Sequence, residues 1–125
     1  MNLAVWVERN GLRWPDRPAL AVGDTVHADW ATFDARVAST AGGLRQHVGL
    51  QPGDRVGIVM RNRPEYLEAL FAIWHAGLVA VPVNARLHRD EIAFVIEQSG
   101  SRVVITDDEH ADDTWSLLDS IDTLD

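Results

Sequence analysis

The sequence predicts an α/β fold: a parallel sheet with βαβ crossovers (Rossmann-like layers), preceded by an N-terminal helix and a β-hairpin. The first observation is three short runs rich in valine and isoleucine, at 55–60, 78–83 and 102–107, which are typical of buried strands. The second is the helical spacing of apolar residues between these runs, at 64–76 and 88–99. This alternation indicates two right-handed crossovers and one parallel sheet buried on both faces.

Local signals predict the elements that precede the sheet. Residues 2–13 carry apolar side chains at helical spacing, and the RWPDRP segment at 13–18 ends this short helix. Two β-prone runs follow, at 19–22 and 25–30. They are separated by Gly23-Asp24, a pair that favours a tight hairpin turn.

Glycine, proline and aspartate mark the remaining boundaries. A helical pattern runs from Thr32 to His47, and Gly49 is expected to cap its C-terminus. Pro64 stands in the first turn of the 64–76 helix, where the missing N–H costs nothing. A further helix is expected to begin after the third strand, capped by Asp107 or Asp108.

Composition predicts a single globular domain over residues 1–125. Hydrophobic residues make up 46% and charged residues 24% of the chain, which is ordinary for a protein with one core. Acids and arginines balance over residues 1–106, so the net charge of −8 lies in the last residues, and 108–125 forms an acidic C-terminal segment. A neutral body with an acidic end is a poor match for nucleic acid or an anionic membrane surface.

The chain is expected to be cytoplasmic, without a membrane span. No apolar run approaches the roughly 20 residues that a membrane helix needs. The N-terminus lacks the basic start of a signal peptide. The absence of cysteine agrees with a reducing compartment.

Residue types also restrict the chemistry. All 11 basic residues are arginine, which excludes a P-loop lysine and a Schiff base within the chain. No GxSxG elbow or glycine-rich phosphate loop is present. The DDEHADD segment at 107–113 lacks calcium-loop and zinc-site spacing, and its acids are interpreted as favouring a helix N-terminus. We therefore expect no catalytic residue and no metal ligand here.

Arg86 is the strongest candidate for ligand binding. It follows Asn84 in the turn after the second strand, and open parallel sheets bind ligands beyond the carboxyl ends of their strands. A guanidinium at such a place suits a phosphate. The Arg61–Arg63 segment follows the first strand in the same way, although Asn62 as a helix cap and two solvated arginines explain it more simply.

Residues 53–107 resemble the N-terminal subdomain of acyl-CoA synthetases, in the AMP-binding, adenylate-forming superfamily. The resemblance rests on ordered signatures at family-like spacing: PGDRV, NRPEYLEALFAIWHAG, VPVNARL and SGSRVVITD. The helix, the hairpin and the WATFDARVASTAGGLR segment upstream are similar as well, so the resemblance covers nearly the whole chain.

The resemblance implies an activity for the complete enzyme. Family members use Mg-ATP to convert a carboxylic acid, such as a fatty acid, to an acyl-adenylate, and then transfer the acyl group to coenzyme A. Their lysine-containing phosphate loop and C-terminal catalytic lysine are not in this sequence. The chain is therefore interpreted as an N-terminal scaffold fragment, inactive and without a bound cofactor when alone. The resemblance further implies that Arg86 approaches a phosphate of coenzyme A, with Asn84 supporting the turn.

Two other interpretations remain open. An independent, non-catalytic α/β binding module would use the loops at 61–63 and 86 to bind a partner or a small ligand. A receiver-like signalling domain is suggested by Asp107-Asp108 at a strand end, but the missing lysine counts against it.

The expected partner is the remainder of the ligase or a second copy of the chain. The helix at 64–76 carries more apolar residues than one face can hold: Leu67, Leu70, Phe71, Ile73 and Trp74. Exposed apolar patches and unpaired strand edges usually become interfaces. We therefore expect self-association through apolar helix faces, or by exchange of residues 1–13 or 108–125.

Overall fold

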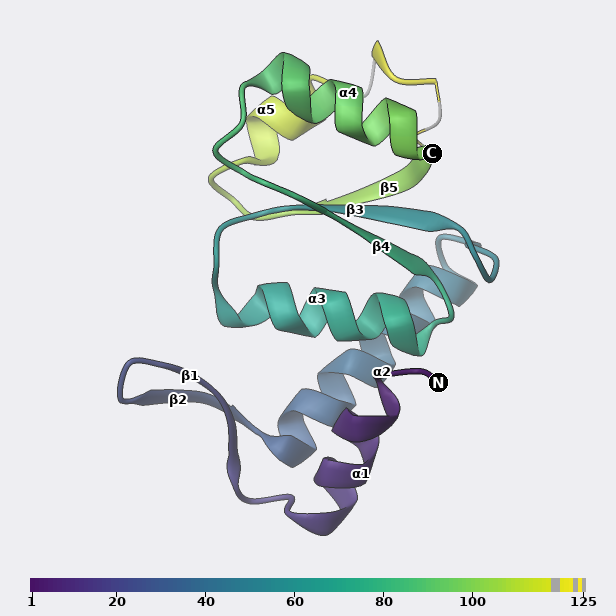
Figure 1. Ribbon diagram of the computed structural model, residues 1–125. Coiled ribbons are helices and arrows are strands. Elements are labelled where there is room, and N and C mark those ends of the chain that lie inside the picture. Colours follow the sequence, from purple (N-terminus) through teal and green to yellow (C-terminus); the bar gives the residue numbers. More distant parts are fainter. Residues whose placement is uncertain (118–119, 123, 125) are drawn as a thin grey trace.

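The computed structural model describes residues 1–117, 120–122 and 124, stacked in layers (Figure 1). Helices α4 and α5 cover one face of a three-stranded sheet, and α3 covers the other. Beneath α3 lie α2, α1 and the hairpin. The elements in chain order are α1 (Val5–Arg13), β1 (Pro18–Val22), β2 (Thr25–Asp29), α2 (Trp30–Gln46), β3 (Arg55–Val59), α3 (Pro64–His75), β4 (Val79–Val83), α4 (Arg89–Ser99), β5 (Ser101–Thr106) and α5 (Ala111–Trp115).

The sheet has the order β4-β3-β5, and both pairings are parallel. The first crossover runs from β3 to β4, and the second runs the opposite way, from β4 across β3 to β5. Crossovers of the same hand therefore place α3 and α4 on opposite faces, as Figure 1 shows. Val59 pairs with Val83 of β4 and with Thr106 of β5. The three strands therefore end at one common edge. The predicted α/β class, with its N-terminal helix and hairpin, is confirmed.

The prediction of a sheet buried on both faces is wrong for β4. Only Val83 of this strand is buried, whereas Val79 is 45% exposed, because β4 lies at the edge of the sheet. The edge position also explains how a strand tolerates Pro82, which has no N–H to donate to a neighbour. The central strand β3 is the one that both helical layers bury.

Gly57 in β3 allows α4 to pack closely on the sheet. A Cβ atom at this position would lie 2.6 Å from Cδ1 of Ile96, which is itself fully buried. It would also lie 3.4 Å from Cγ2 of Val104 in β5. The absence of a side chain in the middle of a buried strand is therefore a packing requirement.

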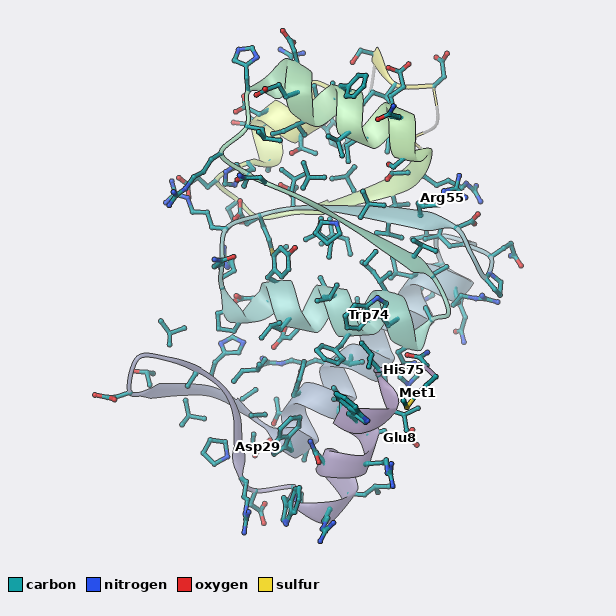
Figure 2. The ribbon with its side chains drawn as sticks, in the orientation of Figure 1. Met1, Glu8, Asp29, Arg55, Trp74 and His75 are labelled. Carbon is teal, nitrogen blue, oxygen red and sulfur yellow. The ribbon has the colours of Figure 1, made fainter. Side chains whose placement is uncertain are left out.

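Helix α3 buries two faces within the chain. Ala69, Ile73 and Leu70 pack against the sheet. The opposite face meets the N-terminal layer, where the ring of Phe71 lies 5.7 Å from that of Phe33 and 5.2 Å from that of Trp74. Trp74 lies on this lower side of α3 (Figure 2). The expectation that the helix leaves an uncovered apolar face is therefore wrong for most of it, and Leu67 is the residue that stays 40% exposed.

The hairpin and α2 have clear local causes. Val22 pairs with Thr25 around Gly23, whose φ of 57° is accessible to glycine. The strand ends at Asp29 because its carboxylate accepts a hydrogen bond from the Thr32 N–H at 2.7 Å and caps α2.

Gly49 is not the C-cap that the sequence predicted. The C-cap of α2 is His47, whose N–H donates to the Gly43 carbonyl at 2.9 Å. Gly49, with a φ of 80°, forms the turn that follows, and the Leu50 N–H then donates back to the Leu44 carbonyl. The helix therefore ends earlier than predicted, with its C-cap two residues before the positive-φ glycine.

The last helix also begins later than predicted. Helix α5 has His110 at its N-cap, and Asp107 instead accepts the His110 N–H in the turn before it. Residues 118, 119, 123 and 125 of the acidic segment lie outside the described residues. Within the described ranges, no helix combines the length and apolarity needed to cross a bilayer.

Candidate functional site

A cleft of about 1010 Å³ lies beyond the carboxyl ends of the strands. Figure 2 labels Arg55 at the amino end of β3, so the cleft is at the opposite end of that strand. Open parallel sheets bind ligands at this edge. The lining comes from the segments after β3, β4 and β5 and from α3: Met60, Arg61, Asn62, Tyr66, Pro82, Val83, Asn84, Ala85, Arg86 and His110.

Arg86 is exposed in this cleft, in a turn that Asn84 closes. The Asn84 Oδ1 atom accepts a hydrogen bond from the Arg86 N–H at 3.0 Å, and the Asn84 carbonyl accepts one from the Leu87 N–H at 3.1 Å. Asparagine favours such a turn because its side chain can bond to the backbone two residues later. Within the described ranges, no carboxylate forms an ion pair with the Arg86 guanidinium. The group can therefore approach an anion from solvent.

The arginines after β3 are engaged with carboxylates. Arg61 pairs with Glu109, and both side chains are more than half exposed. The Arg63 Nε atom donates to Glu65 at 2.9 Å, a hydrogen bond that raises the pKa of Arg63. Arg63 is also the N-cap of α3, without a side-chain capping bond. The expected cap at Asn62 is therefore wrong, and the two arginines are exposed but paired with carboxylates.

Sequence reasoning missed the most buried charge at this edge, Asp107. Its side chain is 3% exposed, and its carboxylate meets three donors: the Arg61 N–H at 3.0 Å, the His110 N–H at 3.0 Å, and Nδ1 of His110. Burial by itself would raise the pKa of Asp107, but the hydrogen bonds from His110 and Arg61 outweigh it and lower the pKa to about 2. The carboxylate is therefore ionised at neutral pH.

Asp107 links the end of β5 to the loop after β3. It also holds His110, which lines the cleft, by the ring nitrogen Nδ1. An aspartate directly after a buried strand, with a histidine three residues later, is the signal that was available in the sequence. The helix dipole explains the acids of this segment as a group, whereas the burial of Asp107 depends on contacts with Arg61 that are distant in the sequence.

The cleft therefore offers two arginines, an imidazole held by a carboxylate, and one phenol ring, a set that suits an anion. Among the described residues, no three metal-type side chains come together. Sequence reasoning placed Asn84 and Arg86 at this edge, and the structure brings them into one cleft with Arg61 and His110.

Comparison with known proteins identifies the class of protein that has this fold. The family model described as AMP-binding enzyme matches residues 7–124. The chain belongs to this family.

Individual relatives carry more specific names. The chain is 40% identical over 116 residues to a feruloyl-CoA synthase of an Amycolatopsis species, covering 93% of this chain and 23% of that protein. It is 32% identical over 117 residues to 4-hydroxybutyrate–CoA ligase 2 of Metallosphaera sedula, covering 94% and 21%. A solved structure from Rhodopseudomonas palustris, provisionally named a long-chain-fatty-acid CoA ligase, is 35% identical with a TM-score of 0.89, covering 99% of this chain and 31% of that one. The chain thus spans about a quarter of the length of the curated relatives.

The resemblance to the N-terminal subdomain of acyl-CoA synthetases is thereby confirmed. The matched segment includes every strand of the sheet and both turns that carry Arg61 and Arg86.

Proposed function

We propose that this chain is the N-terminal scaffold of an ATP-dependent acid–CoA ligase of the cytoplasm and contributes Arg86 to the binding of coenzyme A. The single observation that carries the proposal is the cleft at the carboxyl edge, with Arg86 exposed in a turn closed by Asn84 in a chain of the AMP-binding enzyme family. The relatives' names include aryl and short hydroxy acids. The aryl name and the long-chain fatty acid name of the Rhodopseudomonas palustris structure support the acid class that we propose, a carboxylic acid with an apolar body.

The scaffold alone is proposed to be inactive. Adenylate formation requires that the charge on the ATP phosphates be neutralised, which a lysine, a glycine-rich loop and Mg²⁺ commonly accomplish. The 125 residues contain no lysine and no glycine-rich phosphate loop. ATP and Mg²⁺ therefore belong to the complete ligase, and the remainder of that ligase is the partner we propose for this chain.

Pyrophosphate release tests the inactivity of the scaffold. The chain is incubated with ATP, magnesium and a panel of fatty and aryl acids, with a no-protein sample as the background. We expect release equal to that background. Turnover above it, retained after further purification, would contradict the proposal.

The Arg86 contact is expected to be weak in the isolated chain. One charge-assisted hydrogen bond contributes about 1.5 to 3 kcal/mol, which by itself supports a complex of millimolar affinity or weaker. The measurement is a titration of coenzyme A followed by NMR chemical shifts, with Arg86→Ala as the test variant. Arg9→Ala is the matched control, because Arg9 is an exposed arginine of α1. Equal shifts in the wild type and Arg86→Ala would refute the assignment.

One observation favours a second candidate, an independent binding module. The two faces of α3 are covered within the chain, so its core needs less cover from elsewhere than the sequence implied. Exposed apolar residues remain on β4, α4 and α5, namely Val79, Phe94 and Trp115, and also on α1 and the hairpin, where Trp6, Leu12 and Val22 are examples. In a ligase these would be the surfaces that its later segments cover, whereas in a module they would stay in solvent or pair with a second copy.

A further inference from the structure

His110 is held in the cleft by a contact that leaves one ring nitrogen for a ligand. Its Nδ1 atom is hydrogen-bonded to Asp107, and its side chain is 15% exposed where it lines the cleft. An ionised carboxylate accepts hydrogen bonds and donates none, so Nδ1 carries the proton in this contact. Nε2 is therefore the nitrogen that can bind a ligand.

Whether Nε2 accepts or donates a hydrogen bond depends on the protonation state of the imidazole. In the neutral ring with Nδ1–H, Nε2 is an acceptor and meets a phosphate oxygen unfavourably. After protonation, Nε2–H is a charged donor, and histidine is the side chain whose unperturbed form changes charge between pH 5 and 8. Asp107 stays ionised throughout that interval, because its pKa is about 2.

We propose that His110 is a second contact for the phosphate group that Arg86 binds, and that this contact operates only when the imidazole is protonated. The inference rests on the proposed function, because it assumes that the cleft takes a phosphate. It assigns Asp107 as the positioning residue, which holds the ring by Nδ1 so that Nε2 remains for the ligand.

The charged groups around His110 permit such a site. Asp107 lies behind the ring, and Arg86 shares the cleft with it. Arg61 also lines the cleft, and its exposed ion pair with Glu109 can open at little cost. His110 also lines a second, small pocket together with Arg89 and Asp113, whose opposite charges balance each other.

The alternative is that His110 serves only as a cap at the start of α5. A cap would use the backbone N–H and the Asp107 contact, both of which are present. It would make no difference to anion affinity. Substituting asparagine separates the two roles, because its Nδ2–H can replace Nδ1–H toward Asp107 while Nε2 is lost.

The test measures anion affinity at two pH values in the wild type, His110→Asn and Arg86→Ala. Inorganic sulfate is the first probe, since it stays doubly charged over this range whereas a phosphate monoester titrates near pH 6. Binding is followed by NMR shifts of the histidine ring protons and the backbone amides at pH 5.5 and pH 8, at constant ionic strength. His47→Asn is the control, as an exposed histidine at the end of α2. Coenzyme A is then titrated in the same way.

We expect the wild type to bind sulfate about tenfold more tightly at pH 5.5 than at pH 8. This ratio of dissociation constants corresponds to the gain of one charge-assisted hydrogen bond. His110→Asn should lose this ratio and match the wild type at pH 8, while His47→Asn keeps it. A ratio below about twofold in the wild type or an unchanged ratio in His110→Asn would overturn the inference.

The two proposals fail in different ways. If Arg86→Ala weakens coenzyme A binding while His110→Asn has no effect at either pH, the His110 contact is wrong and the proposed role of Arg86 stands. If His110→Asn removes the pH dependence while Arg86→Ala changes nothing, the anion site is at His110 and the coenzyme A contact assigned to Arg86 is wrong.

Discussion

Replacing Asp107 by asparagine should destabilise the fold at neutral pH. The carboxylate is 3% exposed and accepts hydrogen bonds from the Arg61 N–H and from two nitrogens of His110. Its pKa falls from 3.8 to about 2 on folding, and this shift corresponds to about 2 kcal/mol of folding free energy. Asparagine keeps one acceptor oxygen but places an N–H₂ group among donors, so a loss of about 2 kcal/mol is expected.

The pH dependence gives this prediction a definite sign. Because the folded pKa lies below the unfolded one, the stabilisation from Asp107 is fully present above about pH 5 and is lost as the pH falls toward 2. By pH 3 about half of the pH-dependent part should be gone. The difference in unfolding free energy between the wild type and Asp107→Asn should therefore be smaller at pH 3 than at pH 7.

Urea unfolding followed by tryptophan fluorescence measures this difference at both pH values. Asp108→Asn is the matched control, since Asp108 is the exposed neighbour, and it should change stability by less than about 0.5 kcal/mol. The reasoning is refuted if Asp107→Asn costs no more than this control, or if its cost is the same at pH 3 as at pH 7.

Three further predictions concern the layers and their surfaces. Glu68 of α3 accepts hydrogen bonds from His27 of the hairpin and Arg36 of α2, and so joins three elements. Glu68→Ala should therefore lower the free energy of unfolding in urea by about 1 to 2 kcal/mol, whereas the control Glu65→Ala, at a more exposed residue, should lower it by about 0.5 kcal/mol or less. Gly100→Ala should destabilise the fold by about 1 kcal/mol or more, because φ at Gly100 is 64° and the new Cβ would meet Arg55. Gly42→Ala should instead raise the melting temperature, because Gly42 lies inside α2 with open space around the position of the new Cβ. Sedimentation at micromolar concentration should show self-association if the exposed apolar residues of β4, α4 and α5 pair between copies; a clean monomer that binds no hydrophobic dye would instead favour the independent module.

Several elements were predictable because their causes are local. The Pro64 start of α3, the Gly23 turn and the Gly100 cap each follow from the backbone preference of one residue. The three strands were predictable from β-branched runs, and their parallel arrangement from the helices between them. Arg86 and Asn84 could be placed at the carboxyl edge for the same reason, because position after a strand is readable along the chain.

The sequence by itself determined the fold class, the order of elements and one side of the candidate site. Only the tertiary structure decided that β3 is the central strand with β4 and β5 at the edges, that α3 buries two opposite faces, and that Asp107 holds His110 beside the cleft. The physical reason is that strand order and helix cover depend on contacts between residues far apart in the chain, whereas propensity and turn preference act over a few neighbouring residues. Asp107 is the clearest case, because its buried carboxylate accepts a hydrogen bond from the Arg61 N–H, which is 46 positions away in the sequence.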